Sequence, residues 1–199
     1  MKKGFSSCVV IAALVILISA GSVFAADDAG KNFISSKVGV GYQGMVAGSF
    51  LNGISVRGWI GDRVGLEGTA FYGKVDAEIE ENGVKEDMVK ADMWMIEAKA
   101  MYALVSRNYS KFYVGGKLGY GQVNMTEYGY KALDGASVFT PGLFIGSEWS
   151  FPQLPEVGFN FDVGYSWLLF GTKTDESPYE YENINMNGVN ATFGIHYYF

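Results

Sequence analysis

Apolar and polar side chains alternate with a period of two along most of this chain. The clearest run covers residues 189–199, where one face is apolar and ends in aromatic rings while the other is mostly small or polar. Because successive side chains of a strand point to opposite faces of a sheet, this run predicts a β-strand with one apolar face. Similar runs predict further strands at 37–46, 53–60, 64–72, 93–104, 112–121, 138–151 and 158–169, which makes eight. The run at 138–151 is unusual because it contains Pro141, which cannot donate a hydrogen bond to a neighbouring strand.

The predicted connections alternate between short turns and longer polar or acidic segments. The short turns lie at 61–63, 106–110 and 152–155. The longer segments are 75–91, 124–137 and 171–187, while the first connection, 47–52, is short and breaks the pattern. Such alternation is typical of outer-membrane barrels, in which the turns face the periplasm and the loops face outward. A hairpin formed within 75–91 would raise the number of strands from eight to ten.

The distribution of charge decides which face of the predicted barrel points inward. If the apolar faces pointed inward, many aromatic rings would crowd a lumen that eight strands only just fill. We therefore expect the apolar faces to contact lipid and the polar faces to line the lumen. An open sheet edge in hydrocarbon would leave backbone groups unpaired, so the sheet must close. The fold class predicted is all-β, an eight-stranded antiparallel up-and-down transmembrane β-barrel.

Aromatic residues gather near the ends of the predicted strands, which is the layout of two interfacial girdles. One girdle, beside the short turns, would contain Tyr102, Phe112, Trp149, Tyr197 and Phe199. The other, nearer the long segments, would contain Tyr72, Trp94, Tyr120 and Trp167.

The first 25 residues predict a secretory signal peptide, with a basic start, an apolar run at 8–20 and small residues before Ala26. The domain division is then a signal peptide at 1–25 and an outer-membrane barrel at 26–199. The formal net charge of -6 argues against a nucleic-acid partner. A single Cys and a single His leave too few ligands for a His/Cys metal site, and we expect no cofactor.

The chain ends in the strand Ile195-His196-Tyr197-Tyr198-Phe199, and the hairpin at 57–68 has a tight polar turn between alternating arms. In these features it resembles the small eight-stranded outer-membrane barrels of the OmpA/OmpX type. The resemblance implies that Ile195, Tyr197 and Phe199 form a C-terminal signal that the barrel-assembly machinery reads. It also implies a Gram-negative-type outer membrane, with lipid and lipopolysaccharide as partners. No peptidoglycan-binding domain follows Phe199, so the envelope-tethering role of full-length OmpA is not expected.

Charged residues on the polar faces predict a network inside the lumen. Arg57 and Glu67 lie at equal distances from Asp62, so a tight hairpin would place them opposite each other. Glu97 and Lys117 come close to opposition across the next short turn. Because charges cannot stay unpaired in a narrow interior, we expect a structural plug; a gate that exchanges ion partners is the alternative. The other expected members are Lys99, Glu148 and Asp162.

Catalysis is not expected from these residues. A Ser/His mechanism needs a base beside a nucleophile and a carboxylate that holds the base. The only histidine, His196, has no serine within two positions on its own strand, and we expect it to be a packed lumenal residue near the periplasmic mouth. No residue is assigned a catalytic, cofactor-binding or metal-binding role.

Acidic residues are concentrated in two of the long segments. Solvated loops are the expected state, while cation bridging to lipopolysaccharide or contact with a surface ligand is the alternative. The spacing does not match a calcium loop. The residues are Asp76, Glu78, Glu80, Glu81, Glu86 and Asp87 in one segment and Asp175, Glu176, Glu180 and Glu182 in the other.

We therefore expect a non-enzymatic integral protein of the outer membrane with a structural or surface-interaction role and a plugged lumen. The first alternative is a narrow porin or channel for small solutes or ions. The second is an enzyme that modifies lipid A.

Overall fold

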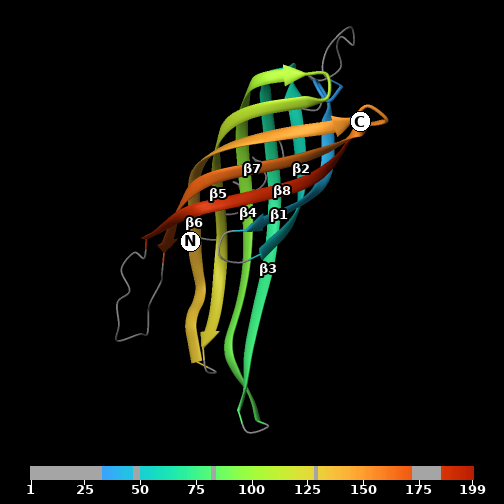
Figure 1. Ribbon diagram of the computed structural model, residues 1–199. Helices are drawn as coiled ribbons and strands as arrows, with labels where there is room; N and C mark the ends of the chain where they lie inside the picture. The colour runs from blue at the N-terminus through green and yellow to red at the C-terminus, as the bar shows by residue number, and fades with distance from the viewer. Residues whose placement is uncertain (1–32, 47–49, 82–83, 128–129, 172–184) are drawn as a thin grey trace.

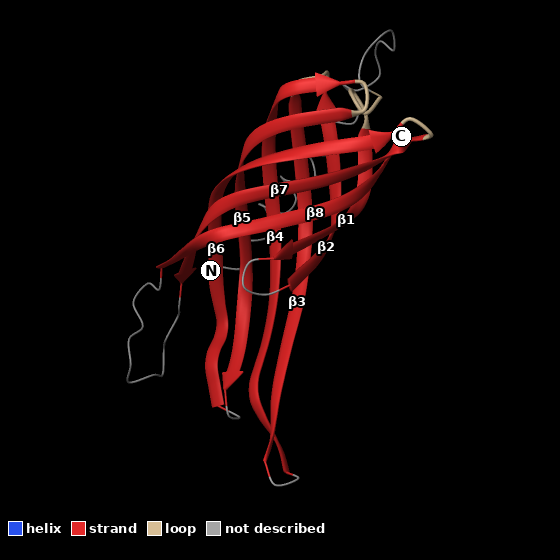
Figure 2. Ribbon diagram, in the orientation of Figure 1, coloured by secondary structure: helices blue, strands red, loops and turns tan. Residues whose placement is uncertain are grey.

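The computed structural model describes residues 33–46, 50–81, 84–127, 130–171 and 185–199. Within these residues, eight antiparallel strands close into one barrel in the order of the sequence (Figures 1 and 2). The strands are β1 (Val38–Val46), β2 (Phe50–Ile60), β3 (Val64–Glu81), β4 (Val84–Arg107), β5 (Ser110–Glu127), β6 (Tyr130–Phe151), β7 (Leu154–Gly171) and β8 (Asn185–Tyr198). Among the described residues, no helix is long and apolar enough to cross a membrane.

The barrel closes where the first strand meets the last. Gly41 of β1 pairs with His196 of β8, and Tyr42 pairs with Ile195, in an antiparallel register. Every other strand pairs with its neighbours in sequence, so the described sheet has no open edge along this ladder. The predicted eight-stranded antiparallel barrel is confirmed.

The segment 75–91 is not a loop, as the sequence pattern suggested, but a continuation of β3 and β4. The two strands stay paired up to Glu81 and Val84, with one register shift between Ala77 and Glu78. The ten-strand alternative is therefore wrong, because the hairpin lengthens two existing strands and adds none. Figure 1 shows this hairpin extending beyond the rest of the barrel.

A similar extension occurs in the next pair of strands. β5 continues to Glu127 and β6 begins at Tyr130, so most of the segment expected as a loop at 124–137 is strand. Polar residues can continue an antiparallel ladder beyond the membrane because the backbone supplies the hydrogen bonds. Residues 172–184, which contain Asp175, Glu176, Glu180 and Glu182, lie outside the described residues.

The short connections are located where the sequence predicts them. β2 and β3 are joined by a turn in which Gly61 has a φ of 59°, a left-handed conformation that glycine adopts readily. β4 ends at Arg107 before β5 begins at Ser110, and β6 ends at Phe151 before β7 begins at Leu154. These turns and Phe199 lie at one end of the barrel (Figure 1).

Pro141 interrupts a ladder without displacing the strand. β6 and β7 pair through Phe139 with Leu169 and again through Gly142 with Ser166, without a shift in register between these pairs. Because proline has no N–H to donate, the gap in the ladder falls at Pro141 and its neighbour. The predicted strand is retained because the ladder resumes directly after the gap.

The side chains of the strands are distributed inside out relative to a soluble barrel. In β6, Leu143 and Ile145 are 63% and 53% exposed, whereas Phe144 between them is only 5% exposed and faces the lumen. Apolar side chains dominate the outer wall, and charged side chains such as Arg57 and Glu148 are fully buried inside. The predicted orientation of the two faces is thus the one observed.

We predict that Gly41→Ala weakens the β1–β8 closure. A Cβ at Gly41 would lie 2.0 Å from the carbonyl oxygen of Ile195 and 2.7 Å from the ring of His196, so both strands would have to move apart. We expect a loss of about 1–3 kcal/mol in the free energy of unfolding, measured by urea titration in detergent with circular dichroism. The control is Gly188→Ala, because a Cβ there meets nothing within 4 Å. Equal stability of the two variants would contradict the tight closure.

Candidate functional site: the charged lumen

Arg57 of β2 is the centre of a buried ion-pair network in the lumen. Its Nε donates to Glu67, the residue directly opposite it on β3. Its Nη1 lies 3.3 Å from Oε2 of Glu148, and its Nη2 lies 3.7 Å from Oδ2 of Asp162. Nη1 also donates to the hydroxyl of Tyr113 at 3.1 Å. One guanidinium therefore holds three carboxylates that come from three different strands.

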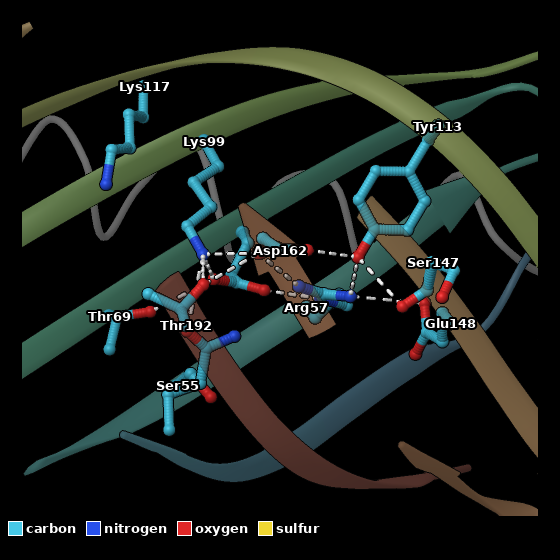
Figure 3. Close-up of polar contacts among 12 residues, drawn as sticks. Ser55, Arg57, Thr69, Lys99, Tyr113, Lys117, Ser147, Glu148, Asp162 and Thr192 are labelled. Atoms are coloured by element: carbon cyan, nitrogen blue, oxygen red, sulfur yellow. Dashed lines mark hydrogen bonds and ion pairs between the residues drawn. The ribbon is translucent and has the colours of Figure 1, made fainter. Parts of the chain in front are cut away.

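Lys99 of β4 is a second centre, and Asp162 lies between it and Arg57 (Figure 3). The Nζ atom of Lys99 lies 2.8 Å from Oδ2 of Asp162 and 3.2 Å from Oε1 of Glu67. It also donates to the hydroxyl of Thr192 at 3.1 Å and to Oε1 of Gln43 at 3.3 Å. Two cations thus share the same two carboxylates, so removing one charge would leave several groups unpaired.

Glu97 and Lys117 form the part of the network that is nearest the end of the barrel where β3 and β4 extend. Nζ of Lys117 lies 3.2 Å from Oε2 of Glu97 and donates to Oδ1 of Asn190 at 2.8 Å. The two residues are diagonal neighbours, because Glu97 pairs with Gly119 in the ladder. Glu97 is joined to the rest of the network by Lys99, whose Nζ lies 3.7 Å from its Oε1. The structure thus brings all the predicted lumenal charges into one connected group.

Three aromatic side chains belong to the same network and were not singled out in the sequence. The indole Nε1 of Trp59 donates to Oε2 of Glu148 at 2.8 Å, and the hydroxyl of Tyr198 donates to Oε1 of the same carboxylate. The hydroxyl of Tyr113 donates to Oδ1 of Asp162 at 2.5 Å. The sequence feature that could have identified them is their strand parity, which places them on the inward face.

The lumen is not polar throughout, which corrects the simple assignment of polar faces to the interior. Below the network, toward the short turns, lies a cluster containing Trp59, Met101, Tyr113, Phe144 and Tyr198. Above it lies a second cluster of Met45, Leu51, Phe71 and Met95. The reason is that the inward faces of β4 and β6 carry methionine and phenylalanine at the same parity as their charged residues. The charged layer is therefore enclosed between two apolar layers.

The segment before β1 closes the barrel end that carries the short turns. Ile34 is 1% exposed and belongs to the lower apolar cluster. Ser35 donates to a carboxylate oxygen of Asp62 and accepts a hydrogen bond from Nζ of Lys111 at 2.9 Å. Nζ of Lys111 also donates to the backbone oxygen of Asp62 at 3.0 Å. These contacts hold the segment across the mouth.

His196 is buried in the lumen and has a serine partner that its own strand does not supply. Its Nε2 lies 2.7 Å from Oγ of Ser55, which comes from β2 and reaches it across β1. Nδ1 of His196 has no hydrogen-bond partner in the described structure, so no carboxylate orients the ring as hydrolysis requires. Both residues are buried inside the wall of the barrel.

Aromatic rings outside the barrel form two bands. Near the short turns, Trp149 stacks on Phe159 with 6.3 Å between ring centroids, and Phe151 contacts the same ring at 5.7 Å. Near the other end, Trp94 meets Tyr120 edge-on at 6.4 Å. Such bands around an apolar belt belong to proteins that cross a bilayer as closed barrels. The chain is a membrane β-barrel of the outer-membrane type.

No family model matches the chain, and no curated protein matches it. Among solved structures, it is similar to the N-terminal β-barrel domain of Pseudomonas aeruginosa OprF, with 14% identity, a TM-score of 0.47 and coverage of 83% of this chain and 98% of that chain. It is also similar to Neisserial surface protein A, with 16% identity, a TM-score of 0.47 and coverage of 82% and 95%. A third similar structure is OprG from Pseudomonas aeruginosa, with 12% identity, a TM-score of 0.47 and coverage of 82% and 94%. Fold and membrane orientation rest on the strand pairing and the wall described above.

We predict that Arg57→Met destabilises the barrel by about 3–5 kcal/mol, because Glu148 loses its cationic partner and Lys99 alone remains to balance Glu67 and Asp162. Urea unfolding in detergent measures the loss. The matched control is Arg63→Met, since Arg63 is exposed at a turn and its loss should change stability far less.

Adding Glu67→Gln to Arg57→Met should recover part of the stability, because it removes one of the buried negative charges that Lys99 would otherwise have to balance alone. A double variant whose loss equals the sum of the two single losses would contradict a direct coupling between these residues.

Proposed function

We propose that the protein is a non-enzymatic integral barrel of the outer membrane with a structural or surface-interaction role, whose lumen is blocked by the charged network. The observation that carries this proposal is the burial of the network. Each of its charged residues is at most 5% exposed, and ion pairs or hydrogen bonds link β2, β3, β4, β5, β6, β7 and β8 across the axis. Buried side chains that are linked in this way across a narrow barrel leave no continuous path for ions.

Opening the plug would require several ion pairs to break together. A gate that exchanges partners would have to separate Arg57 from three carboxylates in a site closed to water. Breaking buried pairs without new partners costs several kcal/mol. A static plug is therefore favoured over a gate.

The ends of the chain support export and insertion. We propose that residues 1–25 are a signal peptide that directs the chain across the inner membrane. In β8, Ile195 and Tyr197 point outward with Phe199 directly after the strand, and all three are exposed on the wall. That placement leaves the C-terminal pattern accessible to the barrel-assembly machinery. Lipid and lipopolysaccharide are the expected contacts of the same wall.

Planar-bilayer recording tests the plug. Refolded protein should give no stable unitary conductance. The double variant Met101→Ala, Phe144→Ala, which thins the lower apolar cluster but keeps every ion pair, should stay equally silent. Discrete current steps from the unmodified protein would overturn the proposal in favour of a narrow channel. Steps from the variant alone would show that the apolar cluster, and not the charged network, is the barrier.

Lipid A analysis tests the absence of enzymatic activity. Mass spectrometry of lipid A from cells with and without the protein should show the same acyl pattern, because Ser55 and His196 are enclosed in the lumen. Cells that express Ser55→Ala should match both. A change in acyl number that Ser55→Ala abolishes would contradict the proposal and assign a hydrolytic role to this pair.

A further inference from the structure

A cavity of about 310 Å³ lies in the lumen on the side of the network away from the short turns. Its walls come from seven of the strands and combine two kinds of side chain. The apolar wall consists of Met45, Leu51, Met93, Met95, Leu168 and Met186. The polar floor consists of Glu97, Lys117, Thr140, Ser166 and Asn190. Its size is at the lower end of the range for small-molecule pockets, which are mostly apolar with a few placed polar groups.

Methionine suits this wall to ligands of varied shape. Its side chain is unbranched and polarisable, so several methionines can repack around different apolar bodies. Met45, Met93 and Met95 lie together in or against the upper apolar cluster. The ion pairs of the plug do not involve these methionines.

Glu97 is the group on the floor that has capacity left for a ligand. It is 1% exposed, and neither of its carboxylate oxygens accepts a hydrogen bond from a described residue. Its ion pairs with Lys117 and Lys99 are at 3.2 and 3.7 Å, and Lys117 donates its hydrogen bond to Asn190 instead. A buried carboxylate with free acceptor sites favours a ligand that brings a donor.

The charge balance of the network indicates that this donor is cationic. The cations of the ion pairs are Arg57, Lys99 and Lys117. The carboxylates are Glu67, Glu97, Glu148 and Asp162. Three positive charges thus meet four negative charges, and Glu97 is the carboxylate that lines the cavity. A positively charged head at Glu97 would balance the network and form a charge-assisted hydrogen bond.

We propose that this cavity binds a small amphipathic cation, with its amine at Glu97 and its apolar body against the methionines. The ligand class is a short primary alkylamine. The proposal rests on the proposed function and extends it. The charged network closes one side of the cavity, so the lumen can bind a ligand without conducting it.

Methionine methyl NMR on the refolded protein in detergent tests the proposal, with hexylamine as the probe at neutral pH. Hexylamine should shift the methyl signals of Met45, Met93 and Met95 in a saturable way. The methyl of Met101, in the lower cluster beyond the network, should stay in place and is the internal control. Shifts that include Met101, or shifts that do not saturate, would indicate partitioning into the detergent or the wall and would overturn the site.

Two matched ligands test the charge requirement. Hexanol has the same chain without the cation, and hexanoate has the opposite charge. Both should bind at least about tenfold more weakly than hexylamine, because neither can form the charge-assisted bond to Glu97. Equal binding of hexanol would contradict the cationic head.

Two variants test the residues, and neither result depends on conductance. Glu97→Gln should weaken hexylamine binding by about tenfold or more, while Glu156→Gln on β7, which does not line the cavity, should bind normally. Met93→Trp should fill the cavity and so block hexylamine binding, while it leaves the ion-pair network intact. Folding of each variant is checked by heat-modifiable gel migration, and Met93→Trp still decides the question if Glu97→Gln does not fold. Unchanged hexylamine binding by folded Met93→Trp would overturn the proposal.

Discussion

The need to satisfy every backbone hydrogen bond inside a hydrocarbon layer determines the rest of this structure. A sheet in lipid has no water to pair its edges, so β1 must bond to β8. Closing only eight strands leaves a lumen just wide enough for side chains. Around Arg57 the lumen then has no room for a hydrated charge, and each charged residue there needs a partner on another strand. The ion pairs of Arg57 and Lys99 are consequences of closure.

The two apolar layers change what the ion pairs do. Electrostatic attraction grows as water is excluded, and so does the penalty for an unpaired charge. With Trp59 and Tyr198 below and Met95 above, the charged layer lies in a compartment with little access to solvent. The layer therefore specifies one arrangement of the strands more strongly than it adds net stability, because any other register would leave charges apart.

The sequence was informative wherever a local rule decides the outcome. Period-two alternation located the strands, and the tight turn at Asp62 placed Arg57 opposite Glu67, because a short hairpin determines its own register. Contacts between strands that meet only because the barrel closes could not be predicted from such local rules. Ser55 and His196 are 141 residues apart in sequence and meet only because β1 lies between their strands.

Two further features could not be predicted from the sequence pattern, for other reasons. The extended hairpin of β3 and β4 was taken for a solvated loop because its sequence is acidic, whereas the backbone hydrogen bonds continue the ladder whatever the side chains are. The upper apolar cluster was missed because Met93 and Met95 share the parity of Glu97 and Lys99 and were assigned to a polar face. Strand parity places a residue on the inner or outer side of the barrel. Whether a layer of the lumen is apolar or charged depends on which residues of all the strands lie at the same level along the barrel axis.

The paired hairpin of β3 and β4 has a consequence for contacts made far from the apolar wall. From the pair Tyr72–Trp94 to the pair Glu81–Val84, the ladder adds nine residues on β3, which corresponds to about 30 Å of strand. That length is several times the distance over which salt screens charge under physiological conditions, about 8 Å. The acidic tip is thus electrostatically independent of anionic headgroups. Because the two strands are already paired up to Glu81 and Val84, docking of a molecule along them would cost less conformational entropy than docking that had to order a loose loop.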